Sequence, residues 1–245
     1  MSTTQQGRPS IIAQGVRKTF LLNHAFSLKD TVVAWVRRRK TTSVFEALKG
    51  IDIVIDEGES VAILGLNGSG KSTFLKLVSG VMQPDAGAVY TRGRVAGLIE
   101  VGAGFHPELS GRENVYLNAA ILGMTRKEIE SRYDEIVAFS EIEEFIDQEV
   151  KHYSSGMFMR LAFSVAIHVE LDVLLGDELL SVGDAPFREK CRIKFIELTE
   201  KNKTLVVVSH DMAMIRELCT RGIVIHKGEV VYDGPVEGAI ARVES

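Results

Sequence analysis

Short apolar runs alternate with longer mixed stretches along most of this 245-residue chain. The runs that predict strands cover residues 50–55, 61–64, 88–90, 95–99, 171–176, 204–209, 223–226 and 229–232. Strands that are apolar throughout and alternate with helices favour a parallel sheet that is covered on both faces. The last two runs flank a Lys-Gly turn, which adds a small antiparallel part. We therefore expect an α/β fold with a mainly parallel sheet.

Between the fourth and fifth of these strands the pattern turns helical, from residue 111 to about 169. Thr125 followed by Glu128 predicts a capping box at the start of one helix. A further long helix is expected from residue 185 to about 202. We interpret residues 1–245 as one domain, with residues 104–169 as a helical subdomain inserted into the α/β core.

Composition restricts the classes of function. Hydrophobic residues make up 45% of the chain and charged residues 25%, which is ordinary for a globular protein, and the net charge is −4. A negative chain is a poor candidate for coating nucleic acid. Cys191 and Cys219 fit no metal-binding spacing and are interpreted as reduced thiols. The N-terminus lacks a secretory pattern, and no apolar stretch is long enough to span a bilayer.

The strongest motif follows the strand predicted at residues 61–64. It is a glycine loop that opens a helix, with the residues Gly65, Leu66, Asn67, Gly68, Ser69, Gly70, Lys71, Ser72 and Thr73. Glycines let the backbone curl so that its N–H groups face phosphate oxygens, and the helix adds its positive end. Lys71 can then reach the β- and γ-phosphates, and the Ser72 hydroxyl can ligate Mg²⁺. The loop predicts a nucleotide-binding site.

Two later strands end in polar residues. Asp177 and Glu178 follow the apolar run at 171–176, and His210 follows the run at 204–209. Adjacent carboxylates at the end of a buried strand need a partner or water. Beside a phosphate-binding loop, Asp177 is expected to hold the Mg²⁺ shell, Glu178 to activate water and His210 to contact the γ-phosphate.

A second candidate anion site begins at Tyr153. Ser154, Ser155 and Gly156 precede an apolar-rich helix, and small hydroxyl residues at a helix start can bind an anion or simply cap the helix.

Together these residues resemble the ATP-binding cassette superfamily, from about residue 11 to residue 241. The resemblance implies a P-loop NTPase (RecA-like) core with ATP and Mg²⁺ as ligands. Residues 65–72 match its Walker A loop, and Asp177 with Glu178 match the end of Walker B. Residues 153–157 match its signature motif, residues 181–184 its D-loop, ending at Asp184, and His210 its switch histidine.

Three segments, at residues 102–114, 153–157 and 178–184, narrow the resemblance to exporters of lipid-linked polysaccharides such as O-antigen, capsule, galactan and teichoic acid. That family implies a head-to-tail homodimer on the cytoplasmic face of the membrane, working with an integral membrane permease and not with nucleic acid. A drug or lipid exporter, or a non-transport cassette ATPase, are the alternatives.

Three features depart from the family pattern. The glutamine that normally contacts the metal is absent, and either Glu100 or Val101 stands in its place. The aromatic that stacks on the nucleotide is either Phe20 or Phe45. Residues 21–44 look like an insertion, interpreted either as an amphipathic helix near anionic lipid or as a solvated basic loop.

Overall fold

Two sheets form the lower part of the molecule in the computed structural model, which describes residues 7–23, 42–98, 102–177 and 183–244. The smaller sheet is antiparallel and has the order β2 (Thr42–Asp56), β1 (Pro9–Asn23) and β4 (Ala86–Thr91). The larger sheet has the order β5 (Val95–Leu98), β6 (Val173–Asp177), β7 (Thr204–Val208), β3 (Ser60–Leu64), β8 (Arg221–His226) and β9 (Glu229–Pro235).

The larger sheet has the predicted character. Its first five strands are parallel to one another, and the edge strand β9 is antiparallel to β8. Every residue of β3 and β7 is buried, as expected for central strands that are covered on both faces. The α/β fold with a mainly parallel sheet and a small antiparallel part is therefore confirmed.

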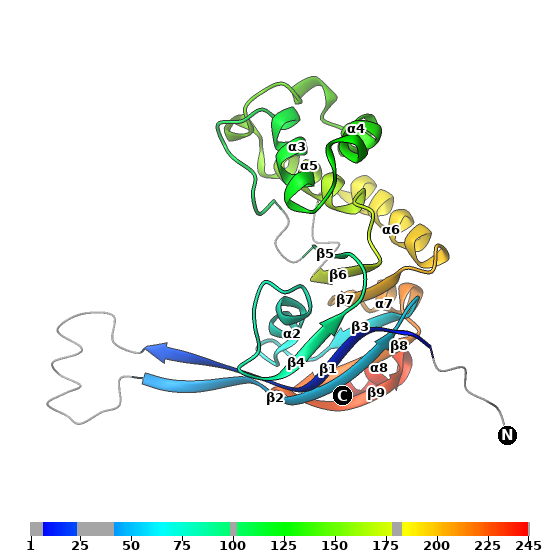
Figure 1. Ribbon diagram of the computed structural model, residues 1–245. Coiled ribbons are helices and arrows are strands. Elements are labelled where there is room, and N and C mark those ends of the chain that lie inside the picture. The colour runs from blue at the N-terminus through cyan, green and yellow to red at the C-terminus, as the bar shows by residue number, and fades with distance from the viewer. Residues whose placement is uncertain (1–6, 24–41, 99–101, 178–182, 245) are drawn as a thin grey trace, which may run out of the picture.

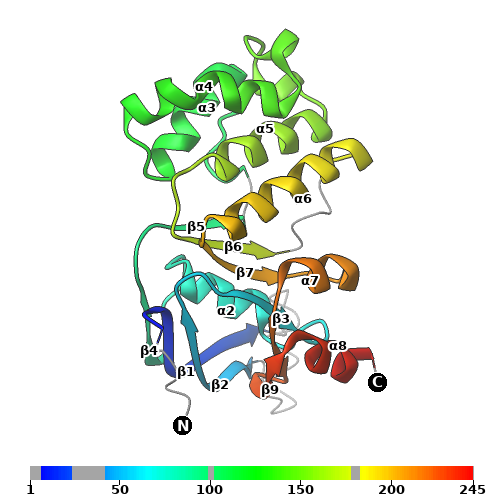
Figure 2. The same ribbon diagram turned by 90° about the vertical axis from the view of Figure 1, so that its right-hand side faces the viewer.

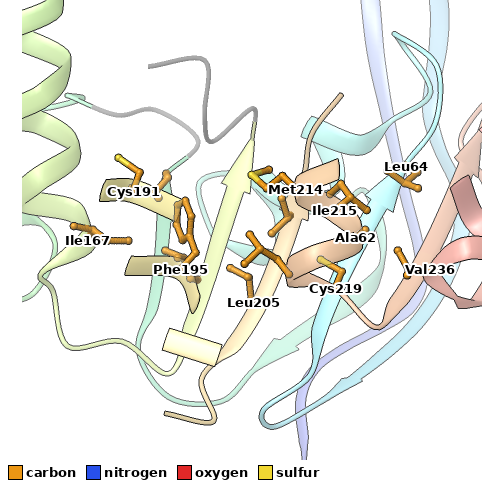
Figure 3. Packing of buried hydrophobic residues seen from close by; sticks show 14 of the residues in the cluster. Ala62, Leu64, Ile167, Cys191, Phe195, Leu205, Met214, Ile215, Cys219 and Val236 are labelled. Atoms are coloured by element: carbon orange, nitrogen blue, oxygen red, sulfur yellow. The ribbon is translucent and has the colours of Figure 1, made fainter. Parts of the chain in front are cut away.

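Two hydrophobic clusters cover the two faces of this sheet. Along β3, Val61 and Ile63 face one cluster while Ala62 and Leu64 face the other, because successive residues of a strand point to opposite faces. The first cluster contains residues of the smaller sheet and of α2 (Lys71–Val78). The second, shown in Figure 3, contains residues of α6 (Ala185–Glu200), α7 (Met212–Leu218) and α8 (Val236–Glu244).

A group of helices lies at the far end of the molecule, at the top of Figures 1 and 2. It contains α3 (Gly111–Ile121), α4 (Arg126–Ser140), the short 3₁₀ turns η1 (Glu143–Phe145) and η2 (Val150–His152), and α5 (Ser155–Ile167). These helices share a separate cluster that includes Val115, Ile129 and Leu161. The interpretation of residues 104–169 as an inserted subdomain stays a prediction. The separate hydrophobic cluster of these helices supports it.

The predicted capping box is present at the start of α4. The Thr125 hydroxyl accepts a hydrogen bond from the Glu128 backbone N–H at 3.3 Å, and the Glu128 carboxylate accepts one from the Thr125 N–H at 2.5 Å. Two backbone donors at this helix end are thereby satisfied, which fixes where the helix begins.

The insertion expected at residues 21–44 begins and ends as strand. Leu21 pairs with Val44 in the β1–β2 ladder, and the two strands run beyond β4 as a two-stranded ribbon (Figure 1). The helix or loop is expected from residues between Phe26 and Lys40, which lie outside the described residues, so that interpretation stays a prediction. The basic cluster of the insertion falls in residues 24–41, outside the described residues. Among the helices that the structure describes, none is long and apolar enough to cross a membrane.

Candidate nucleotide-binding site

A pocket of about 160 Å³ lies where β6 and β7 end and α2 begins. Its lining is drawn from four separate parts of the chain: Phe45, Ala47, Asn67, Gly68, Gly70, Lys71, Ser72, Thr73, Asp177, Val208 and His210. Carboxyl ends of parallel strands are where ligands of open α/β sheets bind. The fold thus brings the glycine loop, the first acid and the histidine to one place.

The glycine loop has a backbone shape that other residues would resist. Gly65 has φ 144°, Gly68 φ 76° and Gly70 φ 114°, all in the region that favours glycine. At Gly65 an added Cβ would also lie 2.1 Å from the Ile225 carbonyl oxygen. Gly70 is the N-cap of α2 and offers no side chain to cap it. The first N–H groups of the helix therefore face the pocket side as donors for an anion.

The Lys71 ammonium is held inside this loop. It donates hydrogen bonds to the carbonyl oxygens of Gly65, at 2.7 Å, and Leu66, at 3.1 Å, and the residue is only 8% exposed. A buried cation among backbone N–H donors makes the pocket suited to a strongly negative group such as a chain of phosphates.

Ser72 and Asp177 supply hydroxyl and carboxylate oxygens on the same lining. Mg²⁺ prefers oxygen ligands and is usually held by one or two carboxylates together with substrate phosphates. The described residues contain no group of three His, Cys, Asp or Glu side chains that could hold a metal alone. The pair therefore fits a Mg²⁺ ion shared with a phosphate ligand. Glu178 and Glu100, and the alternative Val101, lie outside the described residues.

His210 is an exposed residue just after β7, and it lines the pocket as the sequence predicts. Ala47 and Val208 also line the pocket. They are ordinary strand residues, and no pattern in the sequence distinguishes them from other apolar positions.

Of the two candidate aromatics, Phe45 lines the pocket and is 43% exposed. Phe20 is not among the lining residues, and it lies directly opposite Phe45 in the β1–β2 ladder. Directly opposed residues of an antiparallel pair share one face of the sheet, so the two side chains lie on the same face.

The signature segment lies elsewhere. Ser154 is the N-cap of α5, and its hydroxyl accepts a hydrogen bond from the Met157 N–H at 3.2 Å. Ser154, Ser155 and Gly156 are all exposed, and none of them lines the pocket. Within one chain, the structure does not bring this helix start to the glycine loop.

Asp184 begins α6 as its N-cap. Its carboxylate accepts a hydrogen bond from the Phe187 N–H at 3.3 Å and pairs with Arg160 at 2.7 Å. Burial acts to raise the pKa of Asp184, but the Phe187 hydrogen bond and the Arg160 charge outweigh it and leave the pKa below its ordinary value. The side chain is thus a carboxylate at neutral pH.

Residues 48–181 match the family model described as ABC transporter, which covers more than half of the chain. The chain belongs to the ABC transporter family. ABC transporter protein AbcA of Aeromonas salmonicida is 43% identical over 240 residues, covering 95% of this chain and 75% of AbcA.

Two further ABC relatives carry names that state an export role. An O-antigen export system ATP-binding protein RfbB of Myxococcus xanthus is 44% identical over 89% of this chain. A teichoic acids export ATP-binding protein TagH of Lactococcus lactis is 42% identical over 96% of it. The chain spans about half the length of both relatives, 51% of RfbB and 50% of TagH.

Solved ABC cassettes have the same fold. The dimeric structure of a post-hydrolysis state of the ATP-binding cassette MJ0796, bound to ADP and Pi, has a TM-score of 0.72 and 25% identity. The match covers 92% of this chain and 98% of that cassette, which confirms the P-loop fold class over nearly the whole length.

Proposed function

We propose that this chain is the ATP-hydrolysing subunit of an exporter that moves a lipid-linked polysaccharide across a membrane. Two observations together carry the proposal: a pocket that suits phosphates, and relatives named for O-antigen and teichoic acid export. The polymer class comes from the relatives, and the chemistry comes from the pocket.

In the proposed ATP complex, the phosphates lie in the loop of residues 65–73. Backbone N–H groups and the start of α2 donate to the phosphate oxygens, and Lys71 neutralises the β- and γ-phosphates. Phe45 is our choice for the side chain that stacks on the base, since it lines the pocket and Phe20 does not. Ser72 and Asp177 would hold the Mg²⁺. Glu100 would add a further carboxylate oxygen if it, and not Val101, stands at the position of the family's glutamine.

Hydrolysis needs a water that attacks the γ-phosphate. Bound Mg²⁺ would offset the charge on the phosphates. Glu178, the residue after Asp177, would orient or deprotonate the water, and His210 would donate to the γ-phosphate from the end of the neighbouring strand β7. The roles of both residues stay proposals, as does the assignment of Asp184 to the D-loop.

A second copy of the chain would complete the site in a head-to-tail homodimer. The exposed Ser154, Ser155 and Gly156 at the start of α5 would contact the nucleotide bound by the partner's glycine loop. The dimeric MJ0796 cassette with ADP and Pi supports an assembly of two cassettes. Because each nucleotide then touches both copies, closure would complete the site and hydrolysis would reopen it.

The transport path would belong to a separate permease in the membrane. We place this chain on the cytoplasmic face, where ATP is available, with residues 104–169 passing the motion to the permease. In this arrangement the polymer is moved without touching the nucleotide pocket.

The test is the sidedness of lipid-linked glycan in cells depleted of this protein. Depletion should leave the glycan on the cytoplasmic side while its synthesis continues. Restoring the wild type should return it to the surface, and Lys71→Ala should not, because the phosphate contact is lost. Lys201→Ala, which changes an exposed lysine at the end of α6, is the control that should restore export.

Unchanged surface glycan in depleted cells would contradict the polysaccharide assignment. If another solute accumulates instead, a drug or lipid exporter is the better reading. If depletion changes no transport and the purified protein still hydrolyses ATP, a non-transport cassette ATPase is the better interpretation.

A further inference from the structure

A second cavity, of about 470 Å³, lies at the edge of the larger sheet where its strands begin. Arg94, Asp172 and Lys203 line it, and they directly precede β5, β6 and β7. Because these strands are adjacent and parallel, their starts lie side by side at one edge of the sheet. The nucleotide pocket lies at the opposite edge, where β6 and β7 end, so the two cavities are separate.

Part of the lining is the short segment that joins the helical group of α3, α4 and α5 to the sheet. Within residues 167–171, Ile167 and Leu171 belong to the hydrophobic cluster shown in Figure 3. Val169 between them belongs to the separate cluster of the helical group. The segment is therefore anchored in both cores, and a molecule bound beside it would contact both parts of the fold.

Two acidic residues, Glu170 and Asp172, also line the cavity, and both are already paired. Arg132 of α4 lies 3.1 Å from the Glu170 carboxylate. Asp172 accepts a hydrogen bond from the Arg94 backbone N–H at 2.9 Å and lies 3.2 Å from the Lys203 ammonium. These contacts, the Arg94 hydrogen bond first, hold the pKa of Asp172 below its ordinary value. Both acids are thus charged and balanced at neutral pH.

The basic residues of the lining outnumber these acids. Arg94 and Lys194 pair with Glu128 and Glu197, both at 3.2 Å, and neither of these two acids lines the cavity. The lining therefore carries an excess of positive charge. A guanidinium has five N–H donors and an ammonium three, so one ion pair leaves each basic side chain with further donors. Such a lining suits a multiply charged anion.

His168 adds a neutral acceptor to this lining. The residue is 5% exposed, and its Nδ1 lies 2.7 Å from the Ser164 carbonyl oxygen. A carbonyl oxygen only accepts, so Nδ1 carries the proton. Burial lowers the pKa of His168, which keeps the ring neutral at pH 7 and leaves Nε2 as an acceptor. Among the described residues Nε2 has no hydrogen-bond partner, and a ligand hydroxyl would supply one.

We propose that this cavity binds a small organic phosphate that carries hydroxyl groups, such as a sugar phosphate. Its phosphate oxygens would accept from Arg132, Lys194 and Lys203, and a hydroxyl would donate to His168. The volume suits a ligand larger than a phosphate ion. Arg132 and His168 belong to the helical group, whereas Lys194 and Lys203 belong to α6 and the sheet. The bound molecule would thus tie the two parts together.

The test is calorimetric titration of the whole chain with glucose 6-phosphate as the probe. ADP is present at saturation to occupy the glycine loop. One probe molecule should bind per chain. Lys194→Gln and Lys203→Gln should each raise its dissociation constant about tenfold, the worth of one hydrogen bond to a charged group. Inorganic phosphate should bind more weakly and glucose not measurably, because each lacks part of the contacts.

A matched control and a map of the site complete the experiment. Lys127→Gln removes the same charge from an exposed position on α4 that does not line the cavity, and should leave the dissociation constant within about twofold. In the wild type the probe should slow amide hydrogen exchange at residues 167–171, because it ties that segment to both parts of the fold. At the same probe concentration Lys203→Gln should show less protection.

No binding of the probe to the ADP-saturated wild type would overturn the inference, since the basic residues would then serve only their ion pairs and the helix ends. Equal affinity in the wild type, Lys194→Gln and Lys203→Gln would do the same. Protection at residues 65–73 in place of 167–171 would put the probe in the nucleotide pocket and also overturn it. The proposed function would stand in each case, because it is tested by ATP hydrolysis and export.

Discussion

At the scale of single residues, the phosphate pocket depends on backbone shape as much as on side-chain charge. Gly65 has a φ of 144° and would clash with the Ile225 carbonyl if it carried a Cβ. Lys71 is held by two carbonyls of the same loop. The loop is thus ordered by its own contacts, and its donors are arranged before a phosphate arrives.

The aromatic that stacks on the nucleotide can be identified by two substitutions. Phe45→Ala should raise the dissociation constant for ATP about tenfold, within the worth of stacking an aromatic ring on a base. Phe20→Ala, its partner across the ladder, is the matched control and should change the constant about twofold at most. Equilibrium binding of a fluorescent ATP analogue measures both. A larger loss in Phe20→Ala would restore Phe20 as the stacking residue.

At the scale of elements, local signals predict the strands of the larger sheet and the capped helix α4. They predict residues 50–55 of β2 but miss the rest of that strand and all of β1. Its pairing register shifts between Ala13 and Val16 and again beyond, which breaks the alternation of period two, and Gly15 has φ 56°. Helices α7 and α8 have seven and nine residues, too short for a clear periodic pattern.

The same reasoning applies to the pocket. The glycine loop, Asp177 and His210 can be predicted because each motif is local in sequence. The choice of Phe45 over Phe20 and the presence of Ala47 and Val208 depend on how distant strands align. The second cavity depends likewise on how the ends of α5 and α6 meet the starts of three strands, and no spacing in the sequence indicates it.

The capping box of α4 is a testable element. Thr125→Ala should lower the free energy of unfolding by about 1 kcal/mol, the usual worth of an N-cap hydroxyl. Lys127→Ala, an exposed residue in the first turn of the same helix, is the control and should stay within about 0.5 kcal/mol of wild type. Chemical denaturation measures both. An equal effect of the two substitutions would mean that the cap contributes nothing specific.

The acid of this box adds a pH dependence. Hydrogen bonds from the Thr125 N–H and hydroxyl lower the pKa of Glu128 from 4.5 to about 2. A depressed carboxyl pKa stabilises the fold above the unfolded value, and this share is lost as pH falls from about 4.5 toward 2. Glu128→Gln keeps the box without the charge and should lose less stability over that range than the wild type. If the free energy of unfolding depended on pH in the same way in the wild type and in Glu128→Gln, this expectation would be contradicted.

At the scale of the whole molecule, the described chain holds two incomplete halves of a site. The pocket carries Lys71, Asp177 and His210, while the exposed start of α5 carries Ser154. Two copies placed head to tail would bring each half to its complement. In the proposed function, closure of the two copies around ATP would be passed to a permease as motion.

The most direct test of this account mixes two damaged copies. Lys71→Ala removes a phosphate contact from one half-site, and Ser154→Arg blocks the other, so each variant alone should fail to form the ATP-closed dimer. A mixed dimer has one intact composite site and one site damaged on both sides. The account predicts partial recovery of ATP-driven closure in the mixture, up to about a quarter of the wild-type number of intact sites under random pairing. No recovery, with mixed dimers demonstrated to form, would contradict the head-to-tail site.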